Sequence, residues 1–358
     1  MNSFKRRFWL ASVVMTALLL IPFFVWSRIE ASRLPPKPAF PLPGHAFVAE
    51  YGGQASYVAH LLYWWGLFGF GERIRSADVV MLGSSHMQFG LSARQLSATL
   101  SAAAGRPLRV FNAGLGCDTP LGFDAALLDR QGVRDRAIIA DTFAYDYDPY
   151  NAECFSELDD ITDRVHAVFE ALAVWTRFAA DWALDGILPR VDLSQRRPVL
   201  GRYLNAPALI LDWNYGDVVY AFSPNRGEVY PAPLASTPQD VAKAQPAGES
   251  LTSGTIPMPN ALANVVARRD LRPIFTLIPF VTTPAFDRER FTHVAQLLAA
   301  AGTAPRAPLI AIAPAGFESF DGEHLTGPSR DQATRRLGDA LAAAEMLQAA
   351  PQDGTRGR

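Results

Sequence analysis

The chain is poor in cysteine: its 358 residues include only Cys117 and Cys154. Two cysteines are too few for a disulfide scaffold, and neither has C-x-x-C or metal-site spacing. In an oxidising compartment the two could pair, and the alternative is two small buried side chains that never meet. The histidines form no cluster with zinc-ligand spacing either, so we expect neither a metal nor another cofactor.

An excess of one charge is also missing. The chain has 33 Lys and Arg against 35 Asp and Glu, and the formal net charge is -2. The two signs are interspersed, whereas a nucleic-acid-binding domain usually carries a basic face or stripe. This composition excludes nucleic acid as an expected partner.

One long apolar run is present, from Phe8 to Trp26, with 19 residues and no charge. As a helix it would be roughly 28 Å long, which is enough to cross a bilayer. Basic residues Lys5 to Arg7 precede it, so the positive-inside rule predicts a cytoplasmic N-terminus and a main domain beyond the membrane. A cleaved signal peptide is the competing interpretation, but Phe24 to Trp26 are bulky where a cleavage site needs small residues. We therefore predict an uncleaved single-pass anchor.

The pattern divides the chain into four parts. Residues 1–27 would be a cytoplasmic stub and the anchor, and residues 28–56 a Pro-rich linker, with an extended spacer at Leu34 to Gly44. Residues 57–349 would form the main domain, with an insertion at about 147–259, and residues 350–358 a disordered tail. We expect the insertion to begin with amphipathic helices and to end in a long loop.

The main domain opens with the aromatic, apolar run Tyr57 to Phe70. This run is too short to span a bilayer, so it suits either a buried helix or a helix that lies in the membrane interface. Of these two uses, packing in the core is the one we expect.

Strands and helices then alternate with short links, which is typical of a parallel sheet with helices on both faces. The sequence therefore predicts an α/β fold, a three-layer α/β/α sandwich with a parallel, flavodoxin-like sheet. Strands are expected at Val79–Leu82, Leu108–Asn112, Ala137–Phe143, Pro273–Pro279 and Pro308–Ala313. Helices are expected at about Ser92–Ala104, Leu121–Gly132, Asn260–Arg269, Asp287–Ala301 and Arg330–Ala349.

Two serines follow the first of these strands, at the G-S-S turn Gly83 to Ser85. The carboxyl end of a parallel strand is where open α/β sheets bind ligands, so a serine here is placed for chemistry. The alternative is that both serines only form the loop and cap the next helix.

A second motif, D-G-E-H-L, favours the chemical interpretation. It places Asp321 and His324 three residues apart, just after the last strand. A serine becomes nucleophilic when a histidine takes its proton, and an acidic side chain then orients the imidazole. We predict a triad in which His324 reaches Ser85 and Asp321 accepts from the histidine, while Ser84 points away and His86 only lines the wall.

The G-S-S turn, the N-A-G-L-G turn at Asn112 to Gly116 and the D-x-x-H-L block together resemble the SGNH (GDSL-like) hydrolase superfamily. The likeness extends from about Asp78 to Leu341, outside the insertion. In that family the serine of the first block is the nucleophile, which corresponds to Ser85. The resemblance implies an oxyanion role for Gly114. We also predict an oxyanion or substrate-binding role for Asn112 in the same turn, and for Thr142 after the third strand, which could substitute for a family donor that is missing there.

More narrowly, the chain is similar to the membrane-anchored periplasmic branch, whose members act in polysaccharide O-acetylation or teichoic acid D-alanylation. This resemblance implies a serine esterase or O-acyltransferase in the inner membrane, with its main domain in the periplasm. Its substrates would be acyl esters of an envelope glycan, and its partner a membrane-bound O-acyltransferase.

The chain departs from the family in one block. A G-x-N-D motif, whose asparagine donates to the oxyanion, should follow the third strand, but the sequence there is D-T-F-A-Y-D from Asp141 to Asp146. Loss of one oxyanion donor typically costs on the order of 100- to 1000-fold in rate. The departure keeps a second hypothesis open, a non-catalytic binding or assembly subunit of an envelope acylation machinery.

Overall fold

The structure, a computed structural model, describes most of the main domain and a few shorter pieces. The described residues are 9, 12–16, 18, 21–22, 46–50, 57–115, 119, 121–142, 164–165, 168–169, 172, 176, 208–223, 227–230, 242–243, 254–278, 284–300, 302–312, 316–319 and 324–344. The spacer at Leu34 to Gly44, both cysteines, Asp321 and the tail 350–358 lie outside these residues.

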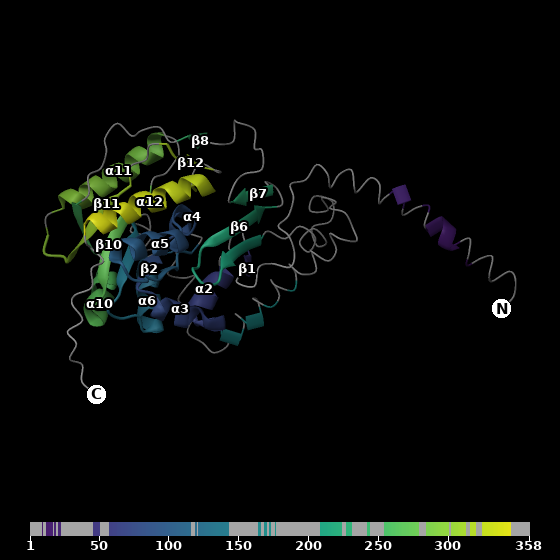
Figure 1. Cartoon of the computed structure of the whole chain (residues 1–358), viewed down its shortest axis with the longest axis horizontal. Coiled ribbons are helices and arrows are strands. Elements are labelled where there is room, and N and C mark those ends of the chain that lie inside the picture. Colours follow the sequence, from purple (N-terminus) through teal and green to yellow (C-terminus); the bar gives the residue numbers. More distant parts are fainter. Residues whose placement is uncertain are drawn as a thin grey trace.

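The centre of the fold is a six-stranded sheet (Figure 1). Five strands are parallel, and β9 lies antiparallel at one edge. In spatial order the strands are β3 (Val110–Asn112), β2 (Val79–Leu82), β4 (Ala137–Asp141), β10 (Arg272–Leu277), β11 (Arg306–Ala311) and β9 (Gly254–Pro257). Counted along the chain, the parallel strands have the order 2-1-3-4-5, which is that of flavodoxin-like sheets. The predicted α/β class with a mostly parallel sheet is confirmed.

Helices cover both faces of this sheet because alternate side chains of each strand point to opposite sides. In β2, Val80 and Leu82 belong to one buried cluster, and Val79 and Met81 belong to the other. The first cluster is covered by α2 (Tyr57–Trp64), α3 (Phe70–Ser76), α6 (Leu121–Gln131) and α10 (Asn260–Arg269). The second is covered by α5 (Ala93–Ala104) and α12 (Gly327–Ala343), while α11 (Pro284–Ala299) packs beside β9.

The aromatic run Tyr57 to Phe70 mainly packs in the core, as expected. Leu61, Leu62, Tyr63 and Phe70 are at most 1% exposed, and Trp64 is 8% exposed. A short 3-10 turn, η2 (Leu67–Gly69), connects α2 to α3 and leaves Phe68 exposed.

A second sheet, which the sequence did not predict, lies beside the first. Its four antiparallel strands follow the order β1 (Ala46–Glu50), β5 (Ala208–Asp212), β6 (Val218–Ser223) and β7 (Gly227–Tyr230). Strand β1 belongs to the segment expected to be linker, and the other three belong to the expected insertion. The small pair β8 (Ala242–Lys243) and β12 (Glu318–Ser319) likewise ties the insertion to the segment before α12.

The turn between β5 and β6 joins the two sheets. Asn112, at the end of β3, donates its backbone N–H to Tyr215 O at 2.7 Å. Gly216 approaches the Asn112 carbonyl so closely, with φ of 71°, that a side chain at this position would collide with it. This contact brings the next residue of the turn, Asp217, to the start of α5.

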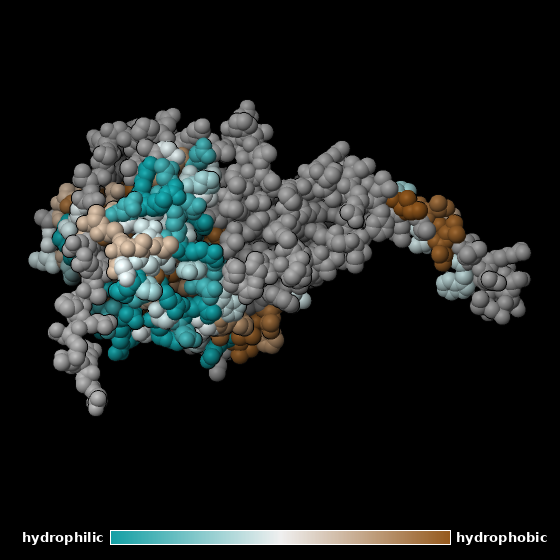
Figure 2. Space-filling view, viewed as in Figure 1, coloured by the Kyte–Doolittle hydropathy of each residue, from teal (hydrophilic) through white to brown (hydrophobic). Residues whose placement is uncertain are grey.

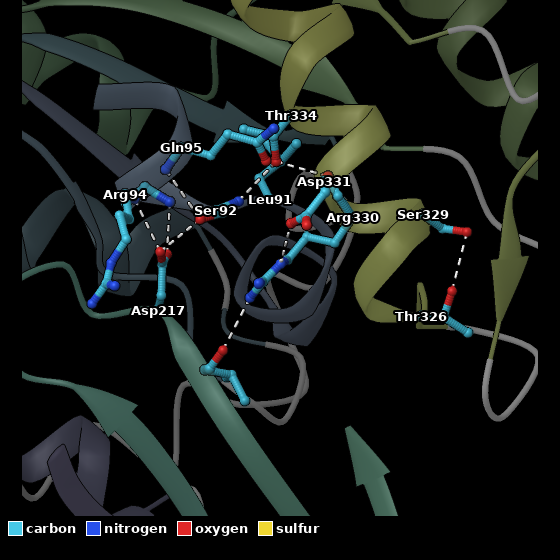
Figure 3. Close-up of polar contacts among 12 residues, drawn as sticks. Leu91, Ser92, Arg94, Gln95, Asp217, Thr326, Ser329, Arg330, Asp331 and Thr334 are labelled. Atoms are coloured by element: carbon cyan, nitrogen blue, oxygen red, sulfur yellow. Dashed lines mark hydrogen bonds and ion pairs between the residues drawn. The ribbon is translucent and has the colours of Figure 1, made fainter. Parts of the chain in front are cut away.

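Asp217 caps α5 from outside that helix (Figure 3). Its carboxylate accepts from Ser92 Oγ at 2.8 Å, Ala93 N at 2.6 Å and Arg94 N at 3.0 Å. Burial raises the pKa of Asp217, while the positive charge of Arg330 and the accepted hydrogen bonds lower it. Ser92 opens an S-x-x-Q sequence, the pattern of a capping box, and it is the N-cap of α5, since its Oγ accepts from Gln95 N at 3.2 Å.

Within the described residues, no helix is both long enough and apolar enough to cross a membrane. Much of the run from Phe8 to Trp26 lies outside those residues. The anchor therefore remains a prediction from the sequence.

Replacing Asp217 with asparagine should destabilise the fold by about 1–3 kcal/mol, because an amide turns one acceptor oxygen into a donor that faces an N–H or O–H group. Urea unfolding followed by circular dichroism would measure the change in the free energy of unfolding. Asp339→Asn, on an exposed position of α12, is the matched control and should change it by less than about 0.5 kcal/mol. Equal effects of the two substitutions would show that the Asp217 cap contributes little.

Candidate active site

The serine turn leaves β2 through a backbone that requires glycine. Gly83 has φ of 136°, and a Cβ there would lie 2.9 Å from the Cβ of Asp141 on the neighbouring strand β4. The next residue, Ser84, is the N-cap of α4 (Ser85–Gly90), and its Oγ accepts from His86 N at 3.3 Å. The turn thus presents Ser85 as the first residue of a helix at the carboxyl end of β2.

Ser85 and His324 meet, as the sequence predicted. His324 Nε2 lies 2.8 Å from Ser85 Oγ, although 239 positions separate the two residues in the chain. Both side chains are half-buried, so they keep contact with solvent. Ser84 by contrast is fully buried, and its Oγ lies 3.1 Å from His86 Nδ1. Each serine thus lies close to an imidazole, but only the pair of Ser85 and His324 is also open to solvent.

Two aromatic rings fix the His324 imidazole. The His86 ring stacks on it with a centroid distance of 5.1 Å and an interplanar angle of 21°. Phe89, one turn further along α4, meets the imidazole edge-on at 5.2 Å. His86 is 4% exposed, so it forms a wall of the site, as expected.

The backbone around His324 is held by the small strand β12. Leu325 forms a bridge with Ser319, and Thr326 N donates to Glu318 O at 2.9 Å. Ser329 Oγ accepts from Glu318 N at 2.7 Å and from Thr326 Oγ1 at 3.2 Å. The histidine therefore lies between a strand pair and the start of α12.

A further contact connects α12 to the segment that carries Ser85. Thr334 Oγ1, on the second turn of α12, accepts from Ser92 N at 2.9 Å and donates to Arg330 O at 2.7 Å (Figure 3). Arg330 in turn donates to Val218 O at 3.0 Å. The hydrogen bond between Ser92 and Thr334 thus helps to fix the distance between the segment that carries Ser85 and the segment that carries His324.

These supporting residues were only partly accessible from the sequence. The capping pattern identified Ser92, but nothing marked Thr334 or Asp217 as its partners. The N-Y-G-D stretch at Asn214 to Asp217 is a turn signal that could have located the β5–β6 connection. Its contact with α5 depends on long-range packing.

The polar groups of Asn112 and Gly114, for which the sequence predicted oxyanion or substrate-binding roles, form hydrogen bonds within the protein. Asn112 is fully buried, and its amide donates to Met87 O at 3.3 Å and Leu91 O at 3.2 Å. The single N–H of Gly114 donates to Asn112 Oδ1 at 2.9 Å. Asn112 therefore links α4 to the turn after β3, and the predicted roles of Asn112 and Gly114 toward a substrate remain predictions.

Thr142 lies directly after β4, the strand that neighbours Gly83. It is 3% exposed, and within the described part of the chain its Oγ1 has no hydrogen-bond partner. A buried hydroxyl without a partner costs about 1–3 kcal/mol. No contact of this hydroxyl with Ser85 occurs among the described residues, so its oxyanion role remains a prediction.

Asp124 is a second buried polar group that has no hydrogen-bond partner among the described residues. It is fully buried on α6, and neither carboxyl oxygen has a hydrogen-bond partner among the described residues. Burial raises its pKa well above the ordinary value, and the nearby charge of Asp141 adds to the increase. Burial and the charge of Asp141 therefore both favour the neutral form of Asp124.

The third member of the predicted triad, Asp321, lies outside the described residues. Its contact with His324 thus remains a prediction. Within the described ranges, no group of three or more His, Cys, Asp or Glu side chains could hold a metal ion.

Comparisons of the chain with protein-family models, with curated proteins and with solved structures found no match. The sequence motifs and the geometry of the site therefore carry the functional argument.

Asp124→Asn should make stability less dependent on pH. Because the pKa is raised in the folded state, the folded protein keeps a proton that the unfolded chain loses above about pH 3.9, and stability falls as pH rises. The asparagine variant should gain stability relative to wild type between pH 4 and pH 8, by about 1.4 kcal/mol for each unit of pKa shift. Urea unfolding at three pH values would measure this, with Asp339→Asn as the control. An equal pH dependence in wild type and Asp124→Asn would contradict a neutral Asp124.

Proposed function

We propose that this chain is a serine esterase or O-acyltransferase of the SGNH type, acting through an acyl-serine intermediate. One observation carries the proposal: Ser85 Oγ and His324 Nε2 lie 2.8 Å apart at the carboxyl end of β2. That distance allows a direct proton transfer from the hydroxyl to the imidazole. The carboxyl end of a parallel strand is also the usual ligand-binding edge of such a sheet.

The proposed reaction has two halves. In the first, His324 takes the Ser85 proton, the serine oxygen bonds to the ester carbonyl carbon, and the proton then passes to the departing alcohol. In the second, His324 takes a proton from water or from an acceptor hydroxyl, which attacks the acyl-serine and releases Ser85. Water as the acceptor gives hydrolysis, and a sugar hydroxyl gives acyl transfer. Asp321 would accept from the other ring nitrogen and stabilise the imidazolium.

The oxyanion of each tetrahedral intermediate needs other donors than those the resemblance implied. The N–H of Ser85 at the first position of α4 has no intrahelical acceptor, because the first N–H groups of any helix lack one. The Thr142 hydroxyl, which has no partner within the described residues, is the second candidate. In this oxyanion hole the Thr142 hydroxyl would replace the asparagine amide of the family, and we therefore expect slow turnover.

The proposed substrates are acetyl or similar small acyl esters of an envelope polysaccharide, and the proposed location is the periplasmic face of the inner membrane. The apolar run Phe8 to Trp26 with basic residues before it supports the membrane location. The likeness to the membrane-anchored SGNH branch supports the substrate class, and also a membrane-bound O-acyltransferase as partner.

The second candidate function is a non-catalytic binding or assembly subunit of the same machinery. Two observations favour it: no asparagine follows β4 between Asp141 and Asp146, and the Gly114 N–H is engaged by Asn112. Both remove a donor that an efficient oxyanion hole would use.

A fluorophosphonate probe separates the two functions and the two serines. It should label wild type and Ser84→Ala, but it should not label Ser85→Ala, because only Ser85 contacts the base. Labelling of a folded His324→Ala variant should be slower than wild type by about 100- to 10,000-fold, which is the usual contribution of a general base. Gel fluorescence over a time course would measure these rates.

Ser84→Ala is the matched control, since it removes a hydroxyl one residue away and costs about 1 kcal/mol of helix capping. Labelling of Ser85→Ala at the wild-type rate would show that the nucleophile is misassigned. If no protein is labelled and Ser85→Ala still complements a deletion strain, the non-catalytic function replaces the enzymatic one.

The membrane topology has its own test. A reporter that is active only outside the cytoplasm, fused after residue 44, should be active, because Lys5 to Arg7 hold the N-terminus inside. The protein should also stay with membranes after a high-salt wash. A shortened chain in the soluble fraction would show that a signal peptide is cleaved.

A further inference from the structure

The link between α2 and α3 projects a phenylalanine into solvent. Gly66, Phe68 and Gly69 all have left-handed backbones, with φ of 61°, 51° and 81°. A left-handed conformation is ordinary for glycine but is a strained outlier for a bulky residue such as phenylalanine. Phe68 is nevertheless 43% exposed. Strain that exposes an apolar side chain is a reason to look for its use.

Contacts on both sides fix this link. Gln131 Nε2 donates to Tyr63 O and to Trp64 O, each at 2.8 Å. On the other side, an Arg73 guanidinium N–H donates to Gly69 O at 3.0 Å. The exposure of Phe68 is therefore built into the fold of the link.

A second group of exposed apolar side chains lies beside this link. The described residues between 164 and 176 are helical, and Val165, Phe169 and Leu172 are spaced to share one helix face. Their exposed fractions are 50%, 66% and 50%. Arg164, directly before Val165, lies next to the link, because its guanidinium is 6.0 Å from the Trp65 ring centroid.

We call this surface the apolar patch. It consists of Trp65, Leu67, Phe68, Val165, Phe169 and Leu172. The exposed large hydrophobic residues of the described chain fall into two groups, this patch and the segment Trp9 to Ile21. Figure 2 shows two corresponding apolar areas, one on the isolated N-terminal segment and one on the domain near α2 and α3.

Arginines border the apolar patch. The Arg130 guanidinium lies 4.2 Å from the Trp65 ring centroid, and Arg73 lies 5.2 Å from that of Trp213, whose ring meets Phe68 edge-on at 6.3 Å. Arg164 adds a third positive charge, while Glu72 is an acidic residue in the same region. Long basic side chains around aromatic and aliphatic groups are typical of surfaces at the membrane interface.

We propose that the apolar patch rests in the interface of an anionic membrane, with Phe68, Phe169 and Leu172 among the acyl chains and the arginines at the phosphates. Charge complementarity favours this occupant, since anionic lipids attract basic residues near the surface. A sugar platform fits less well, because the arginines already cover faces of Trp65 and Trp213. The inference depends on the proposed function in one respect only, the N-terminal anchor that would hold the domain near the membrane.

A fluorescent probe on Phe68 tests this contact. The full chain with Phe68→Cys, labelled with an NBD dye, is placed in lipid nanodiscs that contain phosphatidylglycerol and a doxyl-labelled lipid. NBD emission should shift to the blue and be quenched by the doxyl lipid. The same dye at Asp339→Cys, on α12 at the opposite face of the sheet, should behave as in water. The unsubstituted chain, treated with the dye, measures the background from Cys117 and Cys154.

Two further variants test the parts of the patch. Phe169→Asp with Leu172→Asp should abolish quenching at position 68. Arg164→Gln should weaken the contact with lipid. The ratio of molecules whose apolar patch touches lipid to molecules whose patch does not should fall about fivefold, as expected for one basic residue at an anionic surface. Arg335→Gln, an exposed position of α12, is its matched control and should leave the ratio unchanged.

Several outcomes would overturn the inference. Equal quenching at positions 68 and 339 would show that the patch does not touch lipid. A blue shift without quenching by the doxyl lipid would mean that a protein or a second copy covers the patch. If the chain does not remain bound to the nanodisc at all, the predicted N-terminal anchor is wrong as well. Esterase activity enters none of these readouts, so an inactive enzyme would leave the inference intact.

Discussion

The hydrogen bonds of Ser92 are the constraint on which the geometry of the site depends. Its backbone N–H reaches Thr334 on α12, and its hydroxyl donates to Asp217 in the second sheet. Only Leu91 separates Ser92 from the end of α4, so one residue joins the segment of Ser85, the helix after His324 and the turn between β5 and β6. A contact of 2.8 Å between residues 239 positions apart requires such a junction.

Much of the fold followed from local patterns in the sequence. The parallel strands could be predicted because buried strands of this class are short apolar runs. The boundaries of α5 and α10 could be predicted because capping residues and apolar periodicity mark them. The pairing of Ser85 with His324 was also predictable, since both follow strands whose carboxyl ends lie at one edge of the sheet. Position along the sheet, rather than distance in the chain, determines which side chains meet.

The remaining features depend on contacts that a sequence does not display. Strand β1 pairs with β5, although the two strands are far apart in the chain. The five residues of β1, A-F-V-A-E, are also too few to show the alternating apolar pattern of a strand. The hydrogen bonds of Asn112 and Gly114 could not be predicted for a different reason. A turn motif shows which groups are near a site, but only coordinates show that an amide has already been used for a backbone carbonyl.

The position of β1 has a mechanical consequence. It is an edge strand, and Ala46 at its start lies opposite Asp212 in an antiparallel ladder that continues to Glu50 opposite Ala208. Tension that enters the domain from the N-terminal side reaches this ladder of five residue pairs before it reaches the central sheet. If the proposed N-terminal anchor holds the chain, the second sheet would therefore bear that pull first, and the separation of Ser85 from His324 would be shielded from it.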